Sequence, residues 1–336
     1  MVPPELSGVL ELFTPQVADS GRQRRLQFLE GRNDVPELDA ARPAAPPWLE
    51  PAQARVVEYF SEAASLFPVW SRGDHLHFGY LAKLKHCFDR ELMLEEMTRQ
   101  VIARLQLDPT ESATLLDLGC GLGASALQVA RQHPRFAVDG ISLVASQVEK
   151  AREKAAASGM VRRLRFWVDD FKGSRAESAA YDGLYAIESA CHDHGLAKAG
   201  FVREAARLLK GGRRLVVADG FWKGEPKRRG LHGAIGGAVE KNWALETFAE
   251  IGAFTSALRA SGFTEIKTEE ISGRIAASAL HAPFLVARCL LENLAGKRPL
   301  GAHGAGHLKA SLLAPLLGMA NRRFGYFLVS ARRRRV

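Results

Sequence analysis

A chain of 336 residues, of which 47% are apolar and 25% charged, can bury a full core, and this composition excludes a wholly disordered protein. The formal net charge of +9 is concentrated in short runs, at 332–335 and 227–229, which could attract an anionic membrane surface or a phosphorylated ligand. Neither an RNA-binding motif nor alternating basic and aromatic residues accompanies these runs, so we expect no nucleic-acid partner.

Four widely spaced cysteines, Cys87, Cys120, Cys191 and Cys289, match neither a metal site nor a disulfide scaffold, which favours a cytoplasmic protein without a bound metal. The first residues carry glutamates and no basic start before an apolar run, so we expect no signal peptide. The apolar stretch 280–291 is shorter than a membrane span and contains an arginine. The basic C-terminus is therefore the candidate for peripheral membrane contact, and the oligomeric state stays open.

The chain changes character near residue 50 and again near residue 114. The first 50 residues are rich in proline and charge, which predicts a loose arm over 1–50 and then a helical cap over 51–100. From Thr114 short apolar runs alternate with helical stretches, the pattern of βαβ units around a parallel sheet. Predicted strands cover 114–118, 136–141, 163–168, 181–187 and 214–218, and predicted helices cover 124–132, 146–158 and 198–209.

Two more predicted strands, 265–271 and 326–331, complete the sheet. The segment 273–323 between them has helical spacing and a break rich in glycine and histidine at 301–307. A structureless loop of that length is uncommon inside a domain, so we predict a helical lid. The predicted divisions are a core over 101–272 with a lid segment at about 222–250, a helical lid over 273–325, and a last strand with basic tail over 326–336.

A glycine loop, Asp117-Leu118-Gly119-Cys120-Gly121-Leu122-Gly123, follows the first predicted strand and opens a helix. Glycine permits positive φ and close approach of a ligand, and the helix N-terminus adds positive potential. A dinucleotide-binding loop is the rival interpretation, but its GxGxxG spacing differs from GxGxG here. The loop resembles motif I of class I S-adenosylmethionine-dependent methyltransferases, which implies S-adenosylmethionine as cofactor. The resemblance makes cofactor residues of Asp117, Gly119, Cys120, Gly121 and Gly123.

The next strand end agrees with that resemblance. Gly140-Ile141-Ser142-Leu143, with Gln147 in the following helix, looks like a variant found in methyltransferases of lipids, tocopherols and sterols. The resemblance implies that Ile141, Ser142 and Gln147 bind the cofactor. Asp139 precedes the glycine and is expected to point elsewhere.

Asp169-Asp170-Phe171 follows the third predicted strand, where methyltransferases of this class place an adenine-binding carboxylate. By that resemblance Asp170 binds the adenine amino group and Phe171 packs on the ring, while Asp169 is expected to be a solvated neighbour. Tyr59, in the cap, is a further cofactor residue by resemblance, with core packing as the alternative.

Residues 114–220 are similar to the sterol C-methyltransferase and γ-tocopherol methyltransferase branch. Tyr185-Ala186-Ile187-Glu188-Ser189-Ala190-Cys191-His192 looks like the YAIExxCH segment of the sterol enzymes, and Gly73-Asp74-His75-Leu76-His77-Phe78-Gly79-Tyr80 resembles the GDHxHxGF box of the tocopherol type. The chain departs from the sterol enzymes in having fewer aromatic residues before the core and no proline after the CH pair. The resemblance implies an α/β, Rossmann-like class I methyltransferase fold, with a seven-stranded mixed sheet, an N-terminal helical cap and a C-terminal helical lid inserted before the last strand.

Methylation of an alkene creates a carbocation, which needs a carboxylate or aromatic face and a base. Glu188 ends the fourth predicted strand, where open α/β sheets bind ligands, and we expect it to stabilise the cation or bind the acceptor. His192 is a candidate base or hydrogen-bond relay and His75 a third catalytic candidate. The alternatives are that Glu188 contacts only the cofactor backbone and that both histidines have structural roles. The candidate substrate-binding residues are Trp70, His77, Tyr80, Trp222 and Trp243.

The leading hypothesis is a C-methyltransferase that acts on an alkene of a lipophilic isoprenoid, sterol-like or prenyl. The alternative is O-, N- or ring C-methylation of a phenolic, quinone or alkaloid molecule, which the box at 73–80 favours. A third hypothesis, a cofactor-binding or membrane-surface module without catalysis, leaves the intact glycine loop, Asp170 and Glu188 unexplained.

Overall fold

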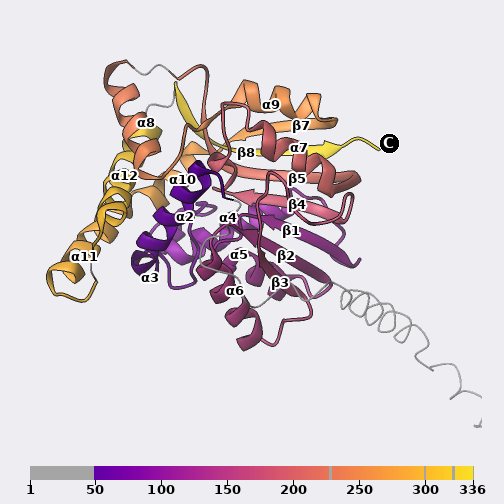
Figure 1. Ribbon diagram of the computed structural model, residues 1–336, viewed down its shortest axis with the longest axis horizontal. Helices are drawn as coiled ribbons and strands as arrows, with labels where there is room; N and C mark the ends of the chain where they lie inside the picture. Colours follow the sequence, from indigo (N-terminus) through magenta and orange to yellow (C-terminus); the bar gives the residue numbers. More distant parts are fainter. Residues whose placement is uncertain (1–48, 227–228, 299, 320–321, 336) are drawn as a thin grey trace, which may run out of the picture. The chain divides into compact units, whose positions relative to one another are not determined.

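The computed structural model describes residues 49–226, 229–298, 300–319 and 322–335 (Figure 1). The predicted arm over 1–50 lies outside the described residues except for its last two positions. Two members of the basic run at 227–229, and the final Val336, also lie outside them.

One sheet of eight strands forms the centre of the described part of the chain (Figure 1). Its strands are β1 (Ala113–Leu118), β2 (Phe136–Ser142), β3 (Leu164–Val168), β4 (Tyr181–Ile187), β5 (Leu209–Trp222), β6 (Ala249–Glu250), β7 (Phe263–Glu270) and β8 (Phe324–Arg333). The order is β3-β2-β1-β4-β5-β8-β7, with β6 paired to β5 outside that path. Strands β1 to β5 are parallel, whereas β8 is antiparallel to β5 and β7. The predicted mixed sheet is confirmed, and the two-residue β6 adds a strand.

The parallel strands are found where the apolar runs predicted them, because strands covered on both faces are apolar along their length. Leu115, Leu116 and Leu118 of β1 are fully buried. β5 is longer than predicted: its first residue, Leu209, already pairs with Tyr181 of β4, so the strand begins directly after the preceding helix.

Helices connect and cover the parallel strands. They are α4 (Arg90–Ala103), α5 (Ala124–Gln132), α6 (Ala145–Ala157), α7 (Ala199–Leu208) and α9 (Ile251–Ala260). α5 packs on α4 and α6, and α7 packs on α9. α7 buries Phe201, Val202, Ala205 and Leu208, the i, i+1, i+4 and i+7 pattern of a helix with one apolar face.

The cap and lid segments are helical. α2 (Pro51–Ala63) and α3 (Phe67–Trp70) precede the core, and α8 (Gly230–Asn242) lies in the predicted lid at 222–250. The segment between β7 and β8 contains α10 (Ser272–Ala279), α11 (Ala282–Leu294) and α12 (Ala302–Met319). α12 packs on α2, α8 and α11 (Figure 1).

The break predicted at 301–307 is wrong, because α12 begins at Ala302. The helix start is held by α2: the His303 amide donates a 2.9 Å hydrogen bond to Oε1 of Glu62. A β-carbon on Gly306 would lie 2.7 Å from the amide oxygen of Asn242 in α8. Glycine is therefore used here for close helix packing, which a local pattern does not distinguish from a loop.

The predicted basic tail is partly built into the sheet, since β8 extends to Arg333. Arg332 donates to the carbonyl of Gly212 at 2.8 Å and pairs with Glu265 at 2.9 Å, and Arg333 donates to the carbonyl of Ser261 at 2.8 Å. Because β8 is antiparallel to β5, this end of β8 lies at the sheet edge opposite the carboxyl ends of β1 and β4.

Candidate active site

A cavity with about 820 Å³ of empty space, part of it open to solvent, lies at the carboxyl ends of the parallel strands. Open α/β sheets bind their ligands at this edge. The wall brings together eleven predicted site residues from five segments of the chain: His75, His77, Asp117, Gly119, Cys120, Gly121, Ser142, Gln147, Phe171, Glu188 and His192. We call it the site cavity.

The glycine loop turns from β1 into α5 with φ values of 104° at Gly119, 50° at Gly121 and 75° at Gly123. A β-carbon on Gly119 would overlap the Ser189 side chain, and one on Gly123 would approach Ala151 at 2.8 Å. These two glycines are required by packing. Gly121 instead faces the cavity with only Leu76 near its missing β-carbon, so it leaves the backbone open to a ligand.

The side chains of Asp117 and Gln147 are two buried polar groups of the wall. Asp117 is only 3% exposed, burial raises the pKa of its carboxyl to about 7, and no cationic side chain pairs with it in the described part of the chain. Gln147 accepts from the Ser142 hydroxyl at 3.0 Å, while its buried Nε2 has no partner among the described residues. A carboxylate and an amide donor suit a ligand with an ammonium group and hydroxyl oxygens, as S-adenosylmethionine has, so the residues fit this cofactor.

Asp139 points away from the cavity, as expected. Its side chain is buried and forms an ion pair of 2.8 Å with Arg165 of β3. Asp139 therefore does not provide the cavity wall with a ribose-binding carboxylate.

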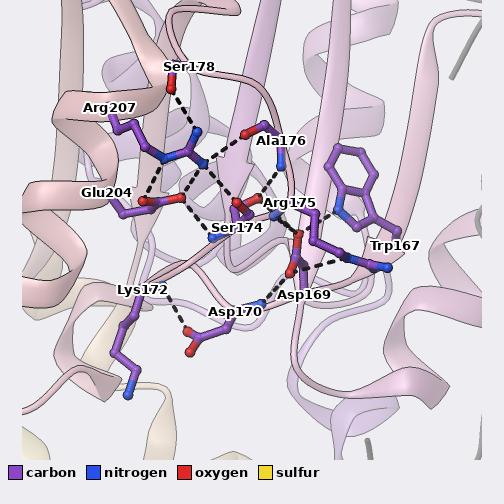
Figure 2. A network of polar contacts seen from close by, with 10 residues as sticks. All are labelled: Trp167, Asp169, Asp170, Lys172, Ser174, Arg175, Ala176, Ser178, Glu204 and Arg207. Carbon is purple, nitrogen blue, oxygen red and sulfur yellow. Dashed lines mark hydrogen bonds and ion pairs between the residues drawn. The ribbon is translucent and has the colours of Figure 1, made fainter. Parts of the chain in front are cut away.

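Asp169 is buried, at 4% exposure, so the expectation of a solvated neighbour is wrong. Its carboxylate accepts hydrogen bonds from the indole of Trp167 at 3.0 Å, the hydroxyl of Ser174 at 2.9 Å and the amide of Arg175 at 3.0 Å (Figure 2). The loop after β3 turns around this carboxylate, which satisfies donors that the turn buries.

Asp170 lies beside the cavity, and its neighbours Asp169 and Phe171 belong to the wall. One carboxylate oxygen of Asp170 accepts from the Lys172 amide at 2.9 Å (Figure 2), and the other accepts from the Gln53 side chain of α2 at 2.5 Å. Burial raises the pKa of Asp170. The contact attaches the cap to the predicted adenine end, and the adenine-binding role of Asp170 stays a prediction.

Glu188 follows β4 in the left-handed backbone region, with φ of 51°. One oxygen of its carboxyl group, Oε1, accepts from the Phe78 amide at 2.6 Å and from the Tyr326 hydroxyl at 2.8 Å. Burial raises the pKa of the Glu188 carboxyl group to about 8. Tyr326 was predicted only as the start of a strand, because sequence spacing does not reveal that β8 lies beside β5.

His75 and His77 form a directed pair in the box at 73–80. Nδ1 of His77 lies 2.9 Å from the carbonyl oxygen of Phe78, which has no proton, so His77 donates. Burial lowers the pKa of His77 to about 3 and that of His75 to about 4, so both rings are neutral at pH 7. Nε2 of His77 then accepts from Nδ1 of His75, 3.2 Å away. The hydrogen-bond partners thus assign the proton of His75 to Nδ1, which leaves a lone pair on Nε2. His75 belongs to the cavity wall.

His192 and Tyr59 both contact the Phe60 ring. The His192 ring is 5.4 Å from that ring, burial lowers its pKa to about 4, and its Nδ1 has no partner among the described residues. Tyr59 is outside the cavity wall, and its hydroxyl is 2.6 Å from Nδ1 of His307 in α12. Sequence reasoning missed His307 as a site neighbour; its histidine-rich segment was the available signal. The cofactor role of Tyr59 stays a prediction.

Four predicted aromatic substrate residues lie outside the cavity wall. Trp222 is buried and donates to Glu240 at 3.0 Å, while Trp243 packs with the same cluster, 6.4 Å from the Phe78 ring. Trp70 packs between α3 and the lid, and Tyr80 packs on the core below Arg274. Their contacts join cap and lid to the core, and their substrate roles stay predictions.

Two predicted cofactor residues, Ile141 and Gly123, also lie outside the wall. The Ile141 carbonyl accepts from the Gly119 and Cys120 amides.

Comparison with known proteins identifies the class. A family described as a methyltransferase domain matches residues 115–212. An O-methyltransferase of Aspergillus nomiae is 30% identical over 173 residues, which cover 52% of this chain and 74% of that protein. The chain belongs to the S-adenosylmethionine-dependent methyltransferases of class I, and its cofactor is S-adenosyl-L-methionine.

More distant relatives share the fold. The chloroplastic tocopherol O-methyltransferase of Arabidopsis thaliana is 24% identical over 66% of each chain. The structure of geranyl diphosphate C-methyltransferase from Streptomyces coelicolor, bound to S-adenosyl-L-homocysteine, has a TM-score of 0.64, with 18% identity, 86% of this chain and 100% of that chain covered. The chain spans only 51% to 62% of the length of other O-methyltransferases that it matches at 32% to 34% identity.

Proposed function

We propose that the chain methylates a hydroxyl group of a small lipophilic acceptor, with His75 as the proton acceptor. One observation carries the proposal: the cavity lined by the glycine loop also contains His75 in the tautomer whose Nε2 has a free lone pair. A neutral imidazole is the form that can accept a proton at pH 7.

The protein would hold the cofactor and the acceptor next to each other and would remove the proton of the acceptor hydroxyl. Asp117 would bind the cofactor's ammonium group, Gln147 a ribose hydroxyl, and the open backbone at Gly121 would line its chain. The cofactor supplies a methyl group bonded to a sulfonium sulfur. When bound, the cofactor would supply this methyl group to the acceptor oxygen, and Nε2 of His75 would take the proton of the hydroxyl group. By holding the cofactor and the acceptor in a fixed relative orientation, the protein would contribute much of the rate.

The chemistry of the wall favours an apolar acceptor. Val56, Phe60, Leu76, Leu122 and Ile187 contribute apolar side chains to the cavity. The names of the relatives agree, since one acts on tocopherol and another on geranyl diphosphate. A prenylated phenol or hydroquinone combines an apolar chain with an ionisable hydroxyl and is the acceptor class that we propose.

Methylation of an isoprenoid alkene is the second candidate, and Glu188 is the observation that favours it. Its carboxyl group lies in the cavity wall, where an anion could stabilise a carbocation. With a pKa raised to about 8, however, most molecules carry Glu188 in the neutral form at pH 7. This second activity would therefore increase as the pH rises through about 8, whereas the His75 route is already available at pH 7.

The test uses the purified chain with S-adenosylmethionine and three acceptors: a prenylated hydroquinone, its dimethyl ether and geranyl diphosphate. We expect mass spectrometry to detect a methyl ether from the first acceptor alone, and His75→Gln to abolish it. Methylation of the dimethyl ether or of geranyl diphosphate would identify carbon as the nucleophile and contradict the proposal. Calorimetric titration with S-adenosylhomocysteine checks that the His75 variant still binds the cofactor product.

A further inference from the structure

Large apolar side chains project into solvent from two segments that lie next to each other. Phe88 is 90% exposed, Phe284 is 78% exposed and Leu294 is 83% exposed, and Leu84, Leu280 and Leu291 are also exposed. A hydrogen bond of 2.9 Å between Nε2 of His281 and the Cys87 carbonyl joins the two segments. We call residues 84–88 together with 280–294 the apolar edge. An exposed apolar patch of this kind marks a protein or membrane contact.

The helical part of this edge is unusually apolar for an exposed segment. Ser272–Leu294 is long and apolar enough to cross a membrane, yet only 28% of its most apolar window is buried. The expectation from residues 280–291 alone underestimated this stretch, which begins earlier. Two features argue against a crossing: a turn at Leu280 and His281 separates α10 from α11, and α11 packs through Val286 and Cys289 against the cap. A helix that packs against its own protein on one side and is apolar on the exposed side is suited to lie along a membrane surface rather than to cross the membrane.

Basic residues accompany the apolar ones in the same two stretches of the sequence. The segments 81–89 and 280–298 contain five lysine and arginine residues and two acidic residues. Both acidic groups are engaged: Glu292 pairs with Arg288 at 3.0 Å and with Arg298, and Asp89 caps α4 through the Leu92 amide at 3.1 Å. Lys83, Lys85 and Lys297 are exposed. This charge is complementary to anionic lipid headgroups and would repel the same surface of a second copy.

We propose that the apolar edge docks on the surface of an anionic lipid bilayer, with Phe88, Phe284 and Leu291 inserted among the acyl chains and the lysines at headgroup level. Helix α10, which directly precedes residues 280–294 of the apolar edge, is hydrogen-bonded to the histidine box, residues 73–80, and to the residue after it: Ser278 accepts from the Gly79 amide at 2.8 Å, and the Arg274 carbonyl accepts from the Leu81 amide at 2.8 Å. Bilayer contact therefore lies beside the box. The arginines at 332 and 333 are tied into the sheet and take no part in it.

The experiment is flotation of the full chain with vesicles of phosphatidylcholine alone or mixed with phosphatidylglycerol. We expect binding to the mixed vesicles to exceed binding to the neutral ones. The triple variant Phe88→Ser, Phe284→Ser and Leu291→Ser should bind about a hundredfold more weakly or worse, because each inserted side chain contributes roughly a factor of ten to partitioning. Leu231→Ser, which removes an exposed leucine from α8, and the pair Arg334→Ser and Arg335→Ser should bind like the unchanged chain.

Three results would overturn the proposal: no flotation of the unchanged chain, equal flotation of the triple variant, or loss of flotation in the tail variant. Sedimentation of the same proteins tests a second copy as the occupant, and a dimer that the triple variant dissociates would also contradict bilayer docking. The replaced side chains are exposed, so circular dichroism should give the same melting temperature for all variants. None of these measurements depends on the acceptor or on methyl transfer.

Discussion

The backbone amide of Phe78 donates a 2.6 Å hydrogen bond to Glu188, a residue 110 positions later in the chain. The histidine box is thereby fixed to the end of β4. Because the carbonyl of the same residue accepts from His77, one residue couples the carboxyl group to the histidine pair. Glu188 thus has an evident structural function beside any catalytic one.

Substitution of Glu188 separates these functions. Glu188→Gln keeps an oxygen that accepts from Phe78 and Tyr326, so we expect a folded protein whose hydroxyl methylation falls by less than about tenfold, since no transition-state charge is lost there. Glu188→Ala leaves the Phe78 amide unpaired and should lower the free energy of unfolding by about 1–3 kcal/mol. Turnover and urea denaturation measure the two effects. A loss of about 10²-fold or more in the glutamine variant would point to cation stabilisation and to the alkene reaction.

His77 is expected to act by positioning His75. In His77→Leu, Nδ1 of His75 has no acceptor, so kcat should fall by about tenfold to a hundredfold, part of the roughly 10²–10⁴ that a positioned base contributes, with KM little changed. His77→Gln retains an acceptor and should recover part of the rate. Nitrogen chemical shifts from NMR report the His75 tautomer without any turnover. If Nε2 of His75 carries the proton in the unchanged chain, the assigned direction of the pair is wrong.

Cofactor binding should depend on pH through Asp117. Its folded-state pKa of about 7 means that the carboxylate is lost as the pH falls, and a neutral carboxyl group cannot pair with an ammonium group. Affinity for S-adenosylhomocysteine should therefore be about tenfold weaker at pH 6 than at pH 8, the ratio of ionised fractions for that pKa. Calorimetry with Asp117→Asn is the control, because this variant should bind weakly with no such dependence. An equal slope in both proteins would assign the titration to another group.

The sequence was most informative where structure is local. Continuous apolar runs predicted the parallel strands, because a strand buried on both faces needs apolar residues along its length. The resemblance to methyltransferase motifs identified Asp117, Gly121, Ser142 and Glu188 as site residues near strand ends, and these residues meet in one cavity because parallel strands share that edge.

Contacts between distant segments were not predictable in this way. Tyr326 contacts Glu188 across 138 positions of the chain, and His307 contacts Tyr59 across 248. Contacts between residues so far apart produce no recognisable pattern in the sequence. Asp169 illustrates a different difficulty. The charge of Asp169 suggested that its side chain is exposed. A carboxylate can be buried, however, when hydrogen-bond donors of the following loop point toward it, and the sequence does not show where those donors point.

The two adjacent aspartates after β3 should therefore respond differently to substitution. Asp169→Ala removes the acceptor of four buried or partly buried donors, and we expect the free energy of unfolding to fall by about 2–4 kcal/mol. Asp170→Ala removes a partly exposed carboxylate with two partners and should lower it by about 1 kcal/mol, while weakening cofactor binding if Asp170 binds the adenine amino group. Urea denaturation and calorimetry on both variants make the comparison. Equal destabilisation would contradict the structural assignment of Asp169, and unchanged affinity in the Asp170 variant would remove that residue from the cofactor site.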